Sequence, residues 1–202
     1  DADGAPVERE VSTSQMAAST ADKGPYRHYM LKEIFEQPAV VAETLEGRIH
    51  KGRLLEESFG YDARRLFDTT KNVHIIACGT SYHAGLVARY WLEDCGIPCS
   101  VEVASEYRYR NVVVPPETLF VTISQSGETA DTLAALRGMR SAGYLGSLTV
   151  CNVPESSLVR ESDVALMTRA GPEIGVASTK AFTTQLVALR LLTLALAKRH
   201  GQ

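Results

Sequence analysis

Short apolar runs recur along most of the chain, and segments with helical patterning separate them. The runs are residues 73–78, 99–103, 119–123, 148–151 and 164–167, and the helical segments are residues 84–95, 129–142, 156–161 and 179–198. Three of the five runs are almost continuously apolar, as strands buried on both faces of a sheet are. Strands that alternate with helices pair in parallel, because each helix carries the chain back along the sheet. The sequence therefore predicts an α/β fold in which helices cover both faces of a five-stranded parallel sheet.

The charge balance and the hydropathy argue against two classes of partner. The 202 residues carry 21 Lys and Arg against 24 Asp and Glu, a net charge of −3, so the basic excess typical of a nucleic-acid interface is missing. The most apolar run, residues 186–197, contains Arg190 and is shorter than the roughly 20 residues that cross a bilayer. We therefore expect a buried helix there, no nucleic-acid partner and no membrane association. Because no export signal is recognisable, we also expect a cytoplasmic protein.

The N-terminal part differs in composition from the rest. Residues 1–24 are small, polar and charged, which is typical of a flexible linker between the domains of a longer protein. Apolar residues at helical spacing after Tyr26 predict a helix that ends at Pro38, since proline interrupts helical hydrogen bonding. A second amphipathic helix is expected over residues 39–49. The predicted organisation is a flexible linker, 1–24, followed by one domain, 25–202, that begins with a helical extension.

Polar loops follow the first and the third apolar runs, at the position where a parallel sheet has its binding crevice. These loops are Gly-Thr-Ser at 79–81 and Ser-Gln-Ser-Gly-Glu-Thr at 124–129, and both open into helices. A helix start offers unpaired N–H groups and a partial positive charge, so several hydroxyls there suit a phosphate held by neutral donors. The simpler alternative is that Ser124 or Ser126 only caps the next helix.

Other reactive side chains form no recognisable catalytic or metal motif. Cys78, Cys95, Cys99 and Cys151 have no second pair of ligands at zinc spacing, so we interpret them as structural residues. The histidines are scattered along the chain, and we expect neither a metal nor a cofactor. Lys180 opens the last helix, where a cation is electrostatically unfavourable. Its presence there favours considering a functional or interface role, but the simplest interpretation of Lys180 is a solvated side chain.

Five longer stretches together resemble one enzyme family. They are KGPYRHYMLKEIFEQP (23–38), CGTSYHAG (78–85), SQSGETADT (124–132), CNVPESSLVRESD (151–163) and EIGVASTKAFTTQL (173–186). In this order they resemble the glucosamine-6-phosphate synthases, which are isomerising glutamine–fructose-6-phosphate aminotransferases. The segment SQSGET alone indicates only the broader sugar-isomerase (SIS) family. The resemblance implies a first SIS domain, a flavodoxin-like three-layer αβα sandwich around a five-stranded parallel sheet, preceded by N-terminal helices.

The resemblance also implies which side chains touch the substrate. In that family, serine and threonine loops bind the phosphate of fructose 6-phosphate, and a further loop touches the sugar. Carried over by motif, the substrate-binding residues are Thr80, Ser81, Ser124, Gln125, Ser126 and Thr129 for the phosphate, with Val176, Ala177 and Ser178 for the sugar. No catalytic residue is carried over, because the family's sugar-isomerising residues lie in its second SIS domain.

Two parts of the family enzyme have no counterpart in this sequence, namely the glutaminase domain with its N-terminal cysteine and the second SIS domain. The resemblance therefore implies the phosphosugar-binding fragment of an enzyme that makes glucosamine 6-phosphate from fructose 6-phosphate and glutamine, in amino-sugar (UDP-N-acetylglucosamine) biosynthesis. Its implied partners are fructose 6-phosphate or glucosamine 6-phosphate, the glutaminase and second SIS domains, and a second copy in a homodimer. The fragment is expected to bind the sugar phosphate without turning it over. Two alternatives stay open: a stand-alone SIS module that senses a phosphosugar, and a purely structural dimerisation module.

Overall fold

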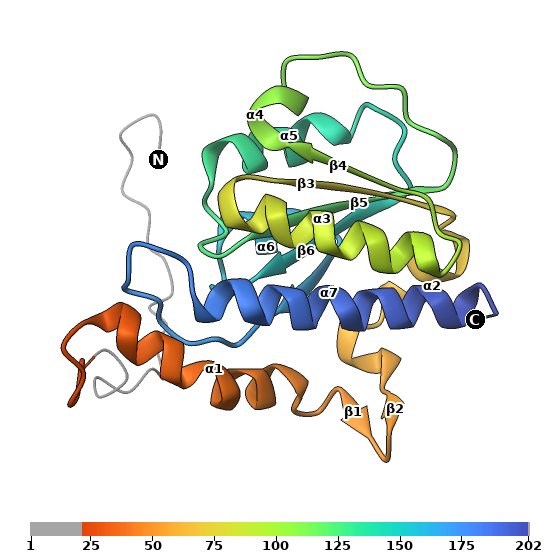
Figure 1. The fold of residues 1–202 in the computed structure, drawn as a ribbon. Helices are drawn as coiled ribbons and strands as arrows, with labels where there is room; N and C mark the ends of the chain where they lie inside the picture. The colour runs from red at the N-terminus through yellow and green to blue at the C-terminus, as the bar shows by residue number, and fades with distance from the viewer. Residues whose placement is uncertain (1–21, 202) are drawn as a thin grey trace, which may run out of the picture.

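The computed structural model describes residues 22–201, which fold around one parallel sheet (Figure 1). The sheet consists of β4 (Cys99–Val103), β3 (Asn72–Ala77), β5 (Thr118–Ser124), β6 (Gly146–Cys151) and β7 (Val164–Met167), side by side in that order and all parallel. The predicted five-stranded parallel sheet is confirmed, and each strand overlaps its predicted apolar run. Almost all of the predicted linker, 1–24, lies outside the described residues.

Helices cover both faces of the sheet. One face packs against α2 (Ala63–Thr69), α3 (Gly79–Asp94) and α7 (Lys180–Arg199), and the other packs against α4 (Ala104–Tyr107), α5 (Ala130–Met139) and α6 (Ser157–Glu161). The central strand β5 is buried along its whole length, with Val121 on the first face and Phe120 on the second, because successive side chains of a strand point to opposite faces. The three-layer αβα sandwich is therefore present.

The long helix α7 is built into this core. Among the described residues, α7 is the one helix that is long enough and apolar enough to cross a membrane. However, 67% of its apolar stretch is buried inside the fold. It packs against α3 on one side and against the N-terminal helix α1 on the other (Figure 1). The buried helix expected over residues 186–197 is confirmed, as part of this longer helix.

The N-terminal extension differs from the prediction. Helix α1 (Tyr29–Leu45) is continuous and contains Pro38, where a break was expected. Pro38 lacks the N–H group that would donate to the carbonyl oxygen of Ile34. The side chain of Gln37 donates to that oxygen instead, at 3.0 Å. Because the exposed carbonyl has a partner and the helix lies along α7, α1 passes through the proline.

A hairpin replaces the end of the second predicted helix. Strands β1 (Ile49–His50) and β2 (Arg53–Leu54) pair in antiparallel fashion and lead into a short 3₁₀ helix, η2 (Glu56–Phe59). The two turn residues, Lys51 and Gly52, both have positive φ angles, of 50° and 72°. A two-residue hairpin turn of this kind matches the twist of the strands. The hairpin was missed because its strands are too short to show a period.

Candidate functional site

The two predicted phosphate loops meet where the sheet changes its winding direction. Strands β3 and β5 are neighbours, but β3 continues through α3 to β4 on one side, and β5 continues through α5 to β6 on the other. Because α3 and α5 cover opposite faces, the loops after these strands diverge, which is the arrangement that opens a ligand crevice. The last paired residues before the loops are Ala77 and Ile123. The loops 79–81 and 124–129 therefore lie side by side at the carboxyl edge of the sheet.

The hydroxyl groups of the second loop brace the loop itself. The Oγ of Ser124 and the Oγ1 of Thr129 are 2.9 Å apart, and Ser124 Oγ also accepts a hydrogen bond from the N–H of Gly127 at 3.0 Å. Ser126 Oγ accepts from the N–H of Glu128 at 3.2 Å. These bonds close the turn before the helix, and within the described chain α5 has no side-chain N-cap hydrogen bond. The alternative in which Ser124 or Ser126 serves as the cap of α5 does not match this geometry.

Gly127 holds the loop against the next strand-to-helix connection. Its φ angle is +69°, and a Cβ at this position would collide with the Oγ of Ser156 and lie 2.8 Å from the Sγ of Cys151. The carbonyl oxygen of Gly127 accepts from the N–H of Leu158 at 3.1 Å. The loop is thus fixed by close backbone contact with β6 and α6, which only a residue without a side chain permits.

Glu128 completes this attachment. Its Oε1 accepts from the backbone N–H of Ser157, in the first turn of α6, at 2.7 Å. That backbone hydrogen bond, and then the Ser157 hydroxyl, lower the pKa of Glu128, since both stabilise the carboxylate form. Glu128 therefore bonds to the start of α6 as a structural contact.

The first loop opens α3 directly after β3. Gly79 has a φ angle of +56°, and Thr80 and Ser81 follow in the first turn, Thr80 exposed and Ser81 buried. Within the described residues α3 also begins without a side-chain N-cap hydrogen bond. Helices α3 and α5 thus both present the positive ends of their dipoles at the same crevice, and this arrangement favours the binding of an anion.

The third predicted segment, which contains Val176, Ala177 and Ser178, lies in the loop before α7. Val176 and Ala177 are exposed, and the Ser178 hydroxyl donates to the Oε2 of Glu173 at 3.3 Å. Figure 1 shows the first turns of α3 and α7 at the same end of the fold. The nine predicted substrate residues therefore lie at the end of β5, in the first turn of α3, and in the loops that precede α5 and α7.

Asn152 connects the second and third loops, and sequence reasoning did not single it out. Its backbone N–H donates to the carbonyl oxygen of Gln125 at 3.2 Å, and its side chain donates to the carbonyl oxygen of Gly171 at 2.7 Å. Its Oδ1 accepts from the N–H of Ala170 at 2.7 Å. A possible signal was its place directly after the fourth apolar run, since residues just beyond parallel strands face the crevice.

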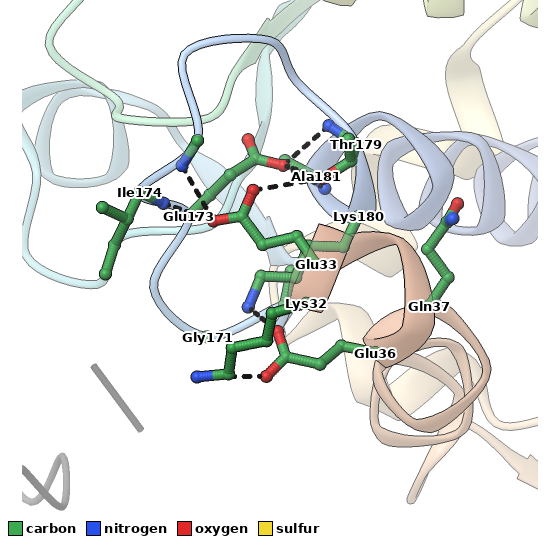
Figure 2. Close-up of polar contacts among 12 residues, drawn as sticks. Lys32, Glu33, Glu36, Gln37, Gly171, Glu173, Ile174, Thr179, Lys180 and Ala181 are labelled. Carbon is green, nitrogen blue, oxygen red and sulfur yellow. Dashed lines mark hydrogen bonds and ion pairs between the residues drawn. The ribbon is translucent and has the colours of Figure 1, made fainter. Parts of the chain in front are cut away.

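Lys180 was interpreted as a solvated lysine, and this is wrong. Lys180 is 3% exposed, and its Nζ lies 2.8 Å from the Oε2 of Glu36 on α1 (Figure 2). Helix α1 covers the first turn of α7 and supplies the carboxylate that makes a buried cation tolerable there. The unfavourable position of a cation at a helix start is compensated by a partner from the N-terminal extension, which the local sequence does not reveal.

A second polar cluster lies away from the crevice, on β3. His74 is buried, its Nδ1 lies 2.7 Å from the hydroxyl of Tyr144, and its Nε2 lies 3.1 Å from the Oε1 of Glu102. The Tyr107 hydroxyl donates to the Tyr144 hydroxyl. The proton of Tyr144 is therefore available for a hydrogen bond to Nδ1 of His74, which fits a neutral imidazole. Burial lowers the pKa of His74, because desolvation outweighs the attraction of Glu102, and the nearby Arg110 acts in the same direction as burial.

The other features of the described chain offer weaker candidates for a functional site. A cleft of about 1100 Å³ lies at the opposite end of α7, but several of its charged groups are paired with one another, as in the Lys198–Glu56 and Arg199–Asp68 ion pairs. All four cysteines are free. Within residues 22–201, no three His, Cys, Asp or Glu side chains gather as a metal site would require.

Comparisons with known proteins identify the family to which the chain belongs. The family model described as "SIS domain" matches residues 66–195. A glutamine–fructose-6-phosphate aminotransferase (isomerizing) from Pseudomonas syringae pv. tomato is 67% identical over 200 residues, and one from Legionella pneumophila is 60% identical over 193 residues. These alignments cover 98% and 95% of this chain but 33% and 32% of the relatives. The chain thus spans about a third of the length of the curated relatives it matches.

A solved structure gives the same result for the fold. The C-terminal domain of glucosamine-fructose-6-phosphate aminotransferase from Francisella tularensis superimposes with a TM-score of 0.87 at 58% sequence identity. The superposition covers 89% of this chain and 51% of that chain. The αβα fold of this chain is therefore shared with that solved structure.

Proposed function

The chain belongs to the SIS domain family, and we propose that it is the phosphosugar-binding part of a glutamine–fructose-6-phosphate aminotransferase. Its ligand is fructose 6-phosphate or the product glucosamine 6-phosphate. The observation that carries this proposal is the loop 124–129, whose hydroxyls stand beside the start of α3 at the winding reversal of the sheet. The identity of 67% over 98% of the chain supports this enzyme over a stand-alone phosphosugar sensor.

The chemistry that the crevice performs is binding. Hydroxyl groups and backbone N–H groups at two helix starts donate to the phosphate oxygens, and the helix dipoles stabilise its charge. The segment 176–178 then borders the sugar. The proton transfers that isomerise the sugar, and the ammonia taken from glutamine, belong to the parts of the enzyme beyond this chain. We therefore expect the chain to bind the ligand and not to convert it.

The proposal is tested by calorimetric titration with fructose 6-phosphate, with fructose and inorganic phosphate as controls. The variant Ser126→Ala/Thr129→Ala removes two donors from the phosphate, and each hydrogen bond to a charged group contributes roughly 1.5–3 kcal/mol, or about tenfold to a hundredfold in affinity. The matched control is Ser141→Ala, an exposed hydroxyl beyond the far end of α5 that donates to Gly138 O at 3.2 Å. Equal affinity in the double variant and in this control contradicts the proposal. Absence of binding by the unaltered chain favours the structural dimerisation module.

Assembly and location complete the proposed function. The protein acts in amino-sugar biosynthesis as a cytoplasmic homodimer together with the glutaminase and second SIS domains. Apolar side chains exposed on α1, among them Ile34 and Phe35, support a covered surface in the assembly. Four free cysteines fit a reducing compartment. Light scattering of the chain with and without the second SIS domain tests the assembly, and a monomer in both mixtures contradicts it.

A further inference from the structure

A carboxylate from the N-terminal extension is buried beneath the loop that precedes α7. Glu33 of α1 is 2% exposed. Its Oε1 accepts from the backbone N–H groups of Ile174 at 2.6 Å and Gly175 at 2.9 Å, and its Oε2 accepts from the Thr179 hydroxyl at 3.3 Å. Figure 2 shows this carboxylate pointing from α1 into the loop, beside Glu173. The donors of the loop offset the cost of burying the charge, so Glu33 and the loop depend on each other.

The far end of the same loop is held by a second carboxylate. The Oε1 of Glu173 accepts from the N–H groups of Thr179 at 2.9 Å and Ala181 at 3.0 Å, in the first turn of α7. The segment between these two attachments carries Val176 and Ala177, which are both exposed. The loop is therefore fixed at both ends while its tip stays free to contact a ligand.

The contact between α1 and the loop leaves room for a Cβ at Gly175 only if the carboxylate of Glu33 moves. A Cβ on Gly175 would lie 2.5 Å from Glu33 Oε2 and 3.4 Å from the Cα of Met30. Farther along α1, Lys180 pairs with Glu36, and the Thr183 hydroxyl donates to the Oε1 of Gln37 at 2.5 Å. Successive turns of α1 thus hold the loop and the start of α7 in one arrangement.

We propose that Glu33 is a positioning residue for the sugar end of the ligand. It touches no ligand atom itself, and it acts by holding the backbone at 174–179 so that the segment 176–178 borders the sugar. This rests on the proposed function, because that function assigns this segment to the sugar and the loops 79–81 and 124–129 to the phosphate. The N-terminal extension, which lies outside the residues 66–195 matched by the family model, thereby becomes part of the binding site.

The test compares two ligands on the same variants. Glu33→Ala is expected to weaken fructose 6-phosphate binding about tenfold, equivalent to roughly 1.4 kcal/mol, and to leave inorganic phosphate binding unchanged. The matched control is Glu43→Ala, which removes an exposed carboxylate from the same helix. Equal losses for both ligands, or no loss for either, overturn the proposal.

Hydrogen exchange of the amides of Ile174 and Gly175 separates this proposal from the proposed function. Loss of protection at these amides in Glu33→Ala, with unchanged protection in β5, supports the positioning role, and unchanged protection at 174 and 175 overturns it. If the unaltered chain binds neither ligand, the proposed function fails, and the exchange data still decide whether Glu33 holds the loop.

Two further variants keep the test decisive if Glu33→Ala does not fold. Glu33→Gln keeps one oxygen for the two N–H groups and loses the charge, so partial rescue of fructose 6-phosphate binding is expected. Gly175→Ala keeps residue Glu33, but its new methyl group displaces the Glu33 carboxylate from the loop, so this variant is expected to reproduce the sugar-selective loss. Gly175→Ala with wild-type affinity for both ligands overturns the proposal.

Discussion

The substitution Gly127→Ala tests whether the phosphate loop depends on close backbone contact. The new methyl group would lie 2.5 Å from the Cβ of Ser156 and 2.8 Å from the Sγ of Cys151, in a backbone conformation with φ at +69°. A left-handed conformation costs a residue with a Cβ about 1–2 kcal/mol. Overpacking in a tightly packed region costs a further ~1–3 kcal/mol.

Together these costs give a loss of about 3 kcal/mol in the free energy of unfolding. For a domain of this size, 1 kcal/mol corresponds to roughly 2–4 °C, so Tm is expected to fall by roughly 6–12 °C. The side chain of Ser126 lies in the same turn, and its Oγ accepts from the Glu128 N–H at 3.2 Å. Affinity for fructose 6-phosphate should therefore fall as well.

The matched control is Gly138→Ala in α5. That glycine has a helical backbone, and nothing lies within 4 Å of its added Cβ. Alanine is more favourable than glycine in a helix by about 0.5–1 kcal/mol, so this variant should be slightly more stable than the parent. Both are measured by urea and thermal unfolding, followed by circular dichroism. A Gly127→Ala protein as stable as the Gly138→Ala protein refutes the reasoning.

Two further predictions concern buried ionisable groups. Lys180→Met should lower the free energy of unfolding by about 1.5–3 kcal/mol in urea titrations, because it removes the buried partner of Glu36; an unchanged midpoint contradicts the role of this pair. The lowered pKa of His74 means that the folded state takes up a proton less readily than the unfolded state. The neutral, buried His74 therefore contributes fully to stability above its pKa in the unfolded state, about 6.5. This contribution is lost as the pH falls through the lower pKa of His74 in the folded state. Unfolding titrations between about pH 8 and about pH 5 test this, and the free energy of unfolding of His74→Phe should fall less with pH than that of the parent. The control His83→Gln changes an exposed histidine and should keep the pH dependence of the parent. Equal pH dependence in all three proteins contradicts the role of His74.

Local patterns predicted the parts of the fold that a local property determines. The strands follow from continuous apolar runs, such as residues 119–123, because a strand covered on both faces can tolerate few polar groups. The loops at 79–81 and 124–129 follow from the rule that residues just beyond parallel strands border the crevice. The short hairpin at 49–54 was missed because two-residue strands show no period.

Contacts between distant segments explain the remaining differences. Pro38 was expected to end a helix, but α1 lies along α7, whose first turn bonds Glu36 and Gln37. Lys180 was expected in solvent, but its partner stands 144 positions earlier in the chain. A pattern of neighbouring residues cannot predict a contact between positions so far apart in the chain.

Local patterns in the amino-acid sequence specify which segments are buried, how they alternate, and which polar loops end the strands. The strand order β4-β3-β5-β6-β7, and with it the meeting of the loops after β3 and β5, became known from the three-dimensional fold. The fold also shows that α1 supplies Glu33 to the loop before α7. This difference arises because hydrophobic periodicity specifies that a face is buried, whereas the identity of the surface that covers it depends on packing across the whole chain.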